Sequence, residues 1–194
     1  MDILFYNAAW MAYNFILALI PVIAGYLFIL IKKSPLRVLY GVIWFLFLPN
    51  TIYIITDILH MLEQFPSIGS EQKIILVLQY AVFEMLGLTA FILAMYPFEK
   101  LLLGSSWKRY SFYLIVLINF LVGFAIVLGR IDRVNSWEVV SNPTRVAMAV
   151  WHTVSSVESM LLVVLFGLFA NFFYFLFRRP FAAFLSKLVS KLDG

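Results

Sequence analysis

The sequence predicts an all-α, polytopic membrane protein with five transmembrane helices plus a C-terminal interfacial amphipathic helix. Of its 194 residues, 64% are hydrophobic and 12% are charged, whereas a soluble domain is about half apolar and roughly a quarter charged. The apolar residues also fall into runs of about 20, the length that crosses a bilayer as a helix. We therefore expect the lipid bilayer to be the main partner of this chain.

Five apolar runs are long enough to span a membrane. In chain order they are Ala9–Ile31, Val38–Ile58, Ile74–Phe98, Tyr110–Gly129 and Val154–Phe177. Short polar segments connect them, and the sequence contains neither an internal repeat nor a low-complexity stretch. We expect residues 1–179 to form one five-helix transmembrane domain.

The basic residues favour one orientation. Ten Lys and Arg lie at one set of helix ends and four, Lys73, Arg130, Arg133 and Arg145, at the other. Basic residues accumulate on the cytoplasmic side of membrane proteins, so the N-terminus is expected outside and the C-terminus inside. Because the basic residues follow the membrane edges and do not form one soluble patch, we expect no nucleic-acid partner.

Residues 180–194 carry a separate helical pattern. Apolar side chains recur at helical spacing after Pro180: Phe181, Phe184, Leu185, Leu188, Val189 and Leu192. This stripe is too short to span a bilayer and favours an amphipathic helix on the cytoplasmic leaflet. The alternative is a helix that packs on the inner loops of the protein itself.

The second apolar run ends in an unusual polar stripe. Asn50, Tyr53, Asp57 and His60 share one helical face, and Pro49 leaves the carbonyl of the residue four before it without a partner, which Asn50 could satisfy. Asp57 and His60 could offer oxygen and nitrogen ligands to one divalent cation. Alternatively they pair with each other, with Arg130 or with water.

Glu84 is the costliest polar residue in a predicted span. A charge at the middle of a bilayer costs about 2.5–3.5 kcal/mol on insertion scales, so Glu84 is expected to face the bundle interior. It could act as a proton carrier, a general base or a metal ligand beside Asp57 and His60. A single interhelical hydrogen bond from the neutral acid is the alternative. Most polar residues within the spans fall in the outer half, which predicts a pocket that opens outward.

The loop after the fourth run carries two arginines. Arg130 and Arg133 could bind a phosphate or carboxylate through paired, forked hydrogen bonds. Alternatively, they could form ion pairs with nearby acidic residues. Asn135 and Glu138 have the spacing of a capping box, and Trp137 between them is typical of a membrane interface.

The last helix is expected to begin at Asn142–Pro143, a cap followed by proline. Continued to Phe177 it would exceed one bilayer, so its first part should project, tilt or break. His152 and Ser156 lie one turn apart there and could form a base and a nucleophile. No nucleophile-elbow motif accompanies them.

Two motifs resemble a known family. Residues 47–60, FLPNTIYIITDILH, are similar to the LPNxxYxxTDxxH signature of the DUF1361 family of bacterial membrane proteins, and residues 129–138, GRIDRVNSWE, resemble its GR…RxNSW(D/E) motif. Glu138 stands where aspartate is common. The resemblance implies a bacterial cell (inner) membrane location and makes a set of residues part of the family pattern: Pro49, Asn50, Tyr53, Thr56, Asp57, His60, Arg130, Arg133, Asn135, Ser136 and Trp137. It implies no activity.

Three functions remain open from the sequence. The first is an outward-facing polar pocket for a small anionic ligand, a lipid head group, an envelope precursor or a cation, with the ligand-binding candidates Asn50, Tyr53, Arg130, Arg133, Asn135 and Trp137. The second is a metal-assisted intramembrane hydrolase or transferase, with the catalytic candidates Asp57, His60, Glu84 and His152 and a divalent metal held by Asp57, His60 and Glu84. The third is an assembly or scaffold subunit with a membrane-protein partner, whose polar residues only join helices.

Overall fold

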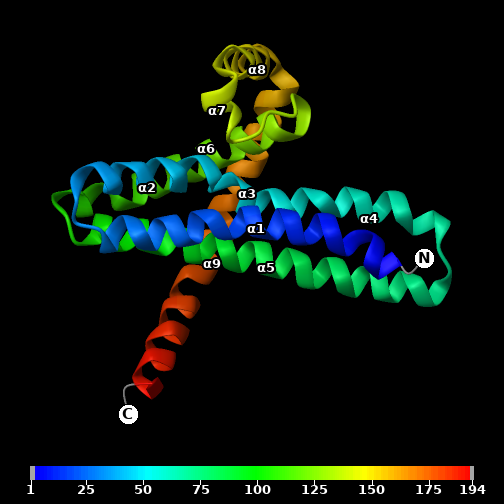
Figure 1. The fold of residues 1–194 in the computed structure, drawn as a ribbon, viewed down its shortest axis with the longest axis horizontal. Helices are drawn as coiled ribbons and strands as arrows, with labels where there is room; N and C mark the ends of the chain where they lie inside the picture. The colour runs from blue at the N-terminus through cyan, green and yellow to red at the C-terminus, as the bar shows by residue number, and fades with distance from the viewer. Residues whose placement is uncertain (1–2, 193–194) are drawn as a thin grey trace.

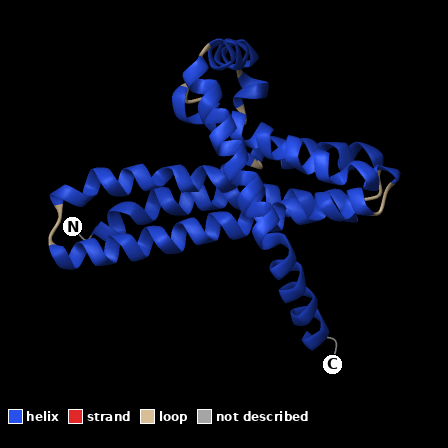
Figure 2. Cartoon of the chain, turned by 180° about the vertical axis from the view of Figure 1, so that it is seen from behind, coloured by secondary structure: helices blue, strands red, loops and turns tan. Residues whose placement is uncertain are grey.

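The computed structural model describes residues 3–192, with side chains described for residues 5–183 and for Lys187. Within that range the regular structure is all helical, joined by short loops, and contains no strand (Figures 1 and 2). The order is α1 (Ile3–Leu30), α2 (Ser34–Phe47), α3 (Pro49–Tyr53), the 3₁₀ turn η1 (Ile54–Asp57), α4 (Ile58–Gln64), the 3₁₀ turn η2 (Phe65–Ser67), α5 (Ser70–Leu103), the 3₁₀ turn η3 (Ser106–Tyr110), α6 (Ser111–Ile131), α7 (Glu138–Ser141), α8 (Pro143–Ser155) and α9 (Val157–Leu192).

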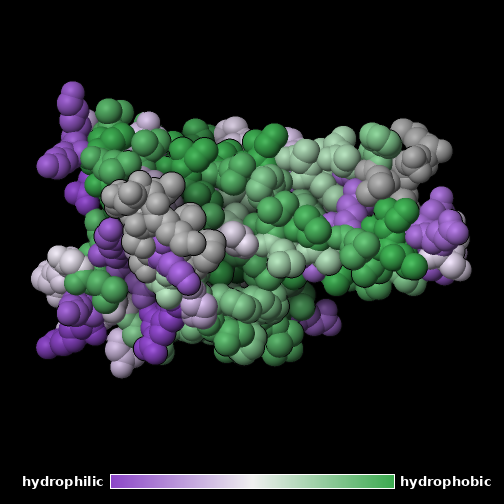
Figure 3. All heavy atoms as spheres, turned by 90° about the horizontal axis from the view of Figure 1, so that it is seen from below, coloured by the Kyte–Doolittle hydropathy of each residue, from purple (hydrophilic) through white to green (hydrophobic). Residues whose placement is uncertain are grey.

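Five segments are long and apolar enough to cross a membrane, which confirms the predicted fold class. They are Phe5–Leu30, Ser34–Ser67, Ser70–Leu103, Ser106–Ile131 and Val157–Ala183. Figure 3 shows a hydrophobic surface over the middle of the molecule and hydrophilic residues gathered at its two ends. The second segment joins several short helices and turns, the third is the single long helix α5, and the fourth joins η3 to α6, so each is longer than the sequence indicated.

The helices pack in two groups. α1 lies alongside α2 and α5, and the most extensive contact in the described part of the chain joins α6 to α9. Figures 1 and 2 show α9 running across the direction of α1 and α5. The α6–α9 contact depends on glycine, because a Cβ added at Gly123 would lie 2.5 Å from the backbone nitrogen of Gly167. Small residues that bring helix backbones close together are typical of membrane interfaces, where packing drives association.

The second span is interrupted next to Pro49. α2 ends at Phe47, and η1 replaces regular helix over Ile54–Asp57. Pro49 has no N–H to donate, and the Thr51 N–H bonds to the Leu48 carbonyl at 3.2 Å. Asn50 therefore donates from Nδ2 to the Phe47 carbonyl, at 3.0 Å. The expectation that Asn50 satisfies the carbonyl four residues before Pro49 was wrong, since the tightened turn exposes a carbonyl nearer to it.

The segment between α6 and α9 forms two short helices, α7 and α8, which stand apart from the long helices in Figure 1. As predicted, Asn142 caps α8 by accepting from the Arg145 N–H at 3.2 Å, and Pro143 follows as the first helical residue. The chain breaks at Ser156, which has extended backbone angles. Its Oγ accepts from the Ser159 N–H at 3.2 Å and so begins α9.

α9 continues through Pro180 and ends at Leu192, so the backbone shows no break at residue 180. The predicted amphipathic segment is therefore the end of α9, and most of its apolar stripe lies beyond the described side chains. Its surface position stays a prediction. Within the bundle, Glu99 on α5 fastens α9 by accepting a hydrogen bond from the Tyr174 hydroxyl at 2.5 Å and by pairing with Arg178.

Candidate functional site

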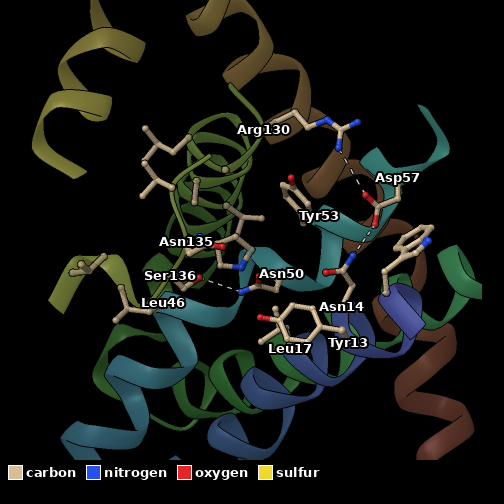
Figure 4. Close-up of a pocket in the computed structure, with 18 of the residues that line it drawn as sticks. Tyr13, Asn14, Leu17, Leu46, Asn50, Tyr53, Asp57, Arg130, Asn135 and Ser136 are labelled. Atoms are coloured by element: carbon tan, nitrogen blue, oxygen red, sulfur yellow. Dashed lines mark hydrogen bonds and ion pairs between the residues drawn. The ribbon is translucent and has the colours of Figure 1, made fainter. Parts of the chain in front are cut away.

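A cavity of about 580 Å³ lies between α1, the interrupted second span, α6 and the loop that follows α6 (Figure 4). Its volume is within the range of small-molecule and cofactor sites. Its lining includes six of the candidates from the sequence: Asn50, Tyr53, Asp57, His60, Arg130 and Asn135. The predicted polar stripe of the second span therefore faces one common space, although η1 interrupts its helix.

An acid and a base face each other at one end of the cavity. Asp57 is 2% exposed, and its Oδ1 lies 3.8 Å from Nη1 of Arg130. Its Oδ2 accepts from Nδ2 of Asn14 at 3.3 Å. A nitrogen–oxygen distance of 3.8 Å is longer than a hydrogen bond. Among the residues that the structure describes, the Arg130 guanidinium has this ion pair and no hydrogen bond.

A second polar pair joins the second span to the loop. Nδ2 of Asn50 donates to Oγ of Ser136 at 3.1 Å, in addition to its bond with the Phe47 carbonyl. In the view of Figure 4, Tyr53 lies between this pair and the Arg130–Asp57 pair. A Cβ at Gly129 would lie 3.2 Å from Cε2 of Tyr53, so the glycine of the Gly-Arg motif leaves room for the ring.

The loop over the cavity is held by its own hydrogen bonds. Arg133 adopts φ 53°, the left-handed conformation that ends many helices and that glycine or asparagine usually supplies. Oε1 of Glu138 accepts from the backbone N–H of Asn135 at 3.1 Å and from its Nδ2 at 3.0 Å. This is the glutamate half of the predicted capping box, whereas α7 itself begins at Glu138 and Asn135 does not cap it. These bonds lower the pKa of Glu138 below its ordinary value, with Arg145 contributing in the same direction.

Arg145 organises the same loop. Its Nη1 pairs with Oε2 of Glu138 at 2.7 Å, and its Nη2 donates to the carbonyls of Asp132 and Arg133 at 3.3 and 3.2 Å. Arg133 itself is exposed and lies outside the cavity lining. The arginine that holds this loop is therefore Arg145, and the role proposed for Arg133 stays a prediction.

The structure does not assemble the proposed metal ligands. Nδ1 of His60 lies 3.4 Å from Oε2 of Glu63, and its ring meets Trp10 edge-on at 5.8 Å. Oε1 of Glu84 is buried without a hydrogen-bond partner, and Glu84 is not among the cavity-lining residues. Within the described residues, no three His, Asp or Glu side chains converge on a point that could hold a metal ion. The donor set therefore does not fit a divalent cation.

His152 belongs to a different part of the surface. Its Nδ1 lies 3.0 Å from Oδ1 of Asp132, whose other oxygen accepts from Thr153 at 3.4 Å. Ser156 is engaged in capping α9, and among the described residues its hydrogen bond with His152 is the helical one between their backbones. Trp137 is 42% exposed and does not line the cavity. Neither His152 nor Trp137 therefore contributes to the Asp57–Arg130 region.

The sequence motifs agree with this geometry. A family model described as "Protein of unknown function (DUF1361)" matches residues 13–173, which is most of the chain. The chain belongs to the DUF1361 family. No curated protein and no solved structure matches it. The residues matched to DUF1361 include both members of each polar pair in the cavity, Asp57 with Arg130 and Asn50 with Ser136.

Motif reasoning overlooked the contribution of α1 to this DUF1361 site. Asn14 bonds to Asp57, and Trp10 lines the cavity beside His60. One turn earlier, the fully buried Asn7 exchanges hydrogen bonds with Gln64 at 3.0 and 3.1 Å. The helical spacing of Asn7, Trp10 and Asn14 is readable in the sequence, but it does not reveal which helix those residues face.

Proposed function

We propose that this protein binds an anionic group, a phosphate or a carboxylate, in the cavity, with Arg130 as its main ligand. The observation that supports this is the incomplete pairing of Arg130. A guanidinium has five N–H donors, yet its one charged neighbour among the described residues is 3.8 Å away. A cation left with free donors in a partly apolar cavity favours an anion that forms forked hydrogen bonds.

Neutral groups on the cavity wall complement that cation. Tyr53 lines the space, and its hydroxyl has no hydrogen bond within the described structure. Ser136 accepts from Asn50 through Oγ and so keeps its own O–H available as a donor. Asp57 holds the Arg130 guanidinium in position when no ligand is bound. Because a guanidinium has five N–H donors, Arg130 can keep its ion pair with Asp57 while it binds an anion.

We further propose that the cavity faces the outside of a bacterial cytoplasmic membrane. Of the fourteen basic residues, ten lie near the α1–α2 turn, the α5–α6 turn and the end of α9, which is the distribution expected of a cytoplasmic side. Figure 3 shows hydrophilic residues gathered at the end of the molecule that carries the two turns. Arg130 and the loop over the cavity are at the other end of α6.

Anion binding is better supported than the two alternatives. The hydrolase or transferase hypothesis needed Asp57, His60 and Glu84 to act together, and those side chains do not converge. The scaffold hypothesis explains buried amide pairs such as Asn7 with Gln64. It does not explain a cavity with an arginine on its wall whose one ion pair among the described residues is 3.8 Å long and leaves its N–H donors free.

The test is binding of radiolabelled inorganic phosphate and acetate to the full-length protein in detergent, measured by equilibrium dialysis. A hydrogen bond to a charged group contributes about 1.5–3 kcal/mol, so Arg130→Gln should weaken binding about 10- to 100-fold. Arg133→Gln is the matched control, because it removes the same charge from the same loop but outside the cavity. Absence of saturable binding, or equal loss in both variants, would refute the proposal.

A further inference from the structure

The wall of the cavity has a polar part and an apolar part. Asp57 and Arg130 lie in the polar part together with neutral groups such as Asn50, and apolar side chains of α1, α2 and α6, including Leu17, Phe45 and Leu121, make up much of the rest. A site for a small soluble anion needs only the polar part. The apolar extension therefore calls for a ligand with an apolar part.

Several wall residues are partly exposed. Tyr13 is 53% exposed, Phe45 is 42% exposed and Leu121 is 40% exposed. All three lie inside segments that are apolar enough to cross a membrane. Such segments meet lipid chains on their outer side, so a cavity with exposed walls between α1, α2 and α6 can be reached from the bilayer.

The depth of the cavity matches one leaflet. Leu121 and Arg130 both line it and are nine residues apart on α6, which is about 13.5 Å at 1.5 Å per residue. The hydrocarbon core of a bilayer is about 30 Å thick, so one leaflet contributes about half of that. An anionic group bound at Arg130 would lie at the level of the lipid head groups. A hydrocarbon chain attached to it would reach Leu121 near the midplane of the bilayer.

The segment above the cavity has the character of an interfacial element. Val139 from α7 and Val146 from α8 line the cavity, while Met148 and Trp151 on α8 are 63% and 74% exposed. α8 connects the end of one span to the start of the next, so it must lie near the membrane face. Exposed tryptophan and apolar side chains at that level are typical of contact with lipid head groups.

We propose that the ligand is a membrane lipid with a phosphate-bearing head group, which enters sideways between α1, α2 and α6. Its phosphate binds Arg130, and its hydrocarbon chain lies along Leu17, Phe45 and Leu121. This inference rests on the proposed anion site and adds the substrate class and the route of entry. It requires no covalent step.

The experiment uses the full-length protein in nanodiscs of digalactosyldiacylglycerol, a host lipid without phosphate, that contain a few per cent of phosphatidic acid with a photoactivatable diazirine at mid-chain. After illumination, labelled peptides are identified by mass spectrometry. We expect labelling to be enriched at Phe45 and around Leu121 and to saturate at low probe content. Arg130→Gln should lower the enrichment at least tenfold.

Two matched variants separate the cavity from ordinary lipid contact. Ala125→Trp fills the cavity wall on α6 and should abolish the enrichment at Phe45, with retention of inorganic phosphate binding. Leu165→Trp adds the same side chain on an exposed position of α9 outside the cavity and should change nothing. Leu121→Trp serves as a second filling variant if Ala125→Trp does not fold.

The outcomes distinguish this inference from the anion site itself. Uniform labelling over all lipid-facing helices, unaffected by filling the cavity, overturns the lipid inference. If Arg130-dependent phosphate binding persists in that case, the protein binds a soluble anion. If phosphate binding is also absent, both proposals fail.

Discussion

Asn50 should stabilise the protein by linking two segments that are far apart in the chain. Its Nδ2 donates to the Phe47 carbonyl at 3.0 Å and to Oγ of Ser136 at 3.1 Å. An unsatisfied buried carbonyl costs about 1–3 kcal/mol, and a hydrogen bond contributes about 1 kcal/mol, less on average inside membranes. Asn50→Ala should therefore lower the free energy of unfolding by about 2 kcal/mol, or roughly 30-fold in the unfolding equilibrium.

A double-mutant cycle with Ser136→Ala isolates the link between helix and loop. Ser136→Ala removes only the second hydrogen bond, so it should cost about 1 kcal/mol or less. The double variant should cost less than the two single changes added together, because both remove the same bond. The assay is reversible unfolding in mixed detergent micelles, followed by tryptophan fluorescence. If Asn50→Ala stays within about 0.5 kcal/mol of wild type, or if the two changes are fully additive, the described link is wrong.

Three further predictions concern packing, pH and orientation. Gly123→Ala should destabilise the α6–α9 contact by about 1–3 kcal/mol, because the new Cβ would lie 2.5 Å from a backbone nitrogen. Gly104→Ala is the control and should stay near wild type in the same unfolding assay, since no atom lies within 3.4 Å of its Cβ. Equal effects of the two changes would contradict the close contact. The pKa of Glu138 is lowered in the folded loop, so its contribution is present above the unfolded carboxyl pKa of about 4.3 and is lost as the pH falls through the folded pKa. Hydrogen exchange over residues 132–142 should therefore rise in acid relative to the intrinsic rate, and this pH dependence should vanish in Glu138→Gln; a variant that keeps the same acid response would refute the assignment. Because the chain has no cysteine of its own, a single introduced cysteine reports its side of the membrane. A membrane-impermeant maleimide should label Ser70→Cys in intact cells and Ser106→Cys only after lysis. The reverse pattern would invert the proposed orientation.

The sequence predicted the fold class because the physical signal is strong and local. Apolar runs of spanning length predict helices that cross a membrane whatever their packing, and all five runs coincide with spans in the structure. The cap at Asn142 and the Asn135–Glu138 link were predictable for the same reason, since both depend on residues three apart. The break in the second span was indicated by Pro49, but the bond of Asn50 to Phe47 depends on how the turn tightens.

The composition of the site was only half predictable. Helical spacing placed Asn50, Tyr53, Asp57 and His60 on one face, and all four line the cavity. Which partner each of them meets depends on tertiary packing, and so the roles of Asn14 and Arg145 were missed. The insertion cost of Glu84 predicted that its carboxyl group faces the bundle interior, but it could not predict whether that group shares a site with Asp57.

The role of Arg130 can be observed directly. In the full-length protein labelled with ¹⁵N-arginine, the side-chain N–H signals of Arg130 are assigned by their loss in Arg130→Lys. Titration with glycerol 3-phosphate should shift these signals in a saturable way, with the signals of Arg133 and Arg145 unchanged. If the Arg130 signals do not move, or if the three arginines shift together, Arg130 is not the ligand of an anion in this cavity.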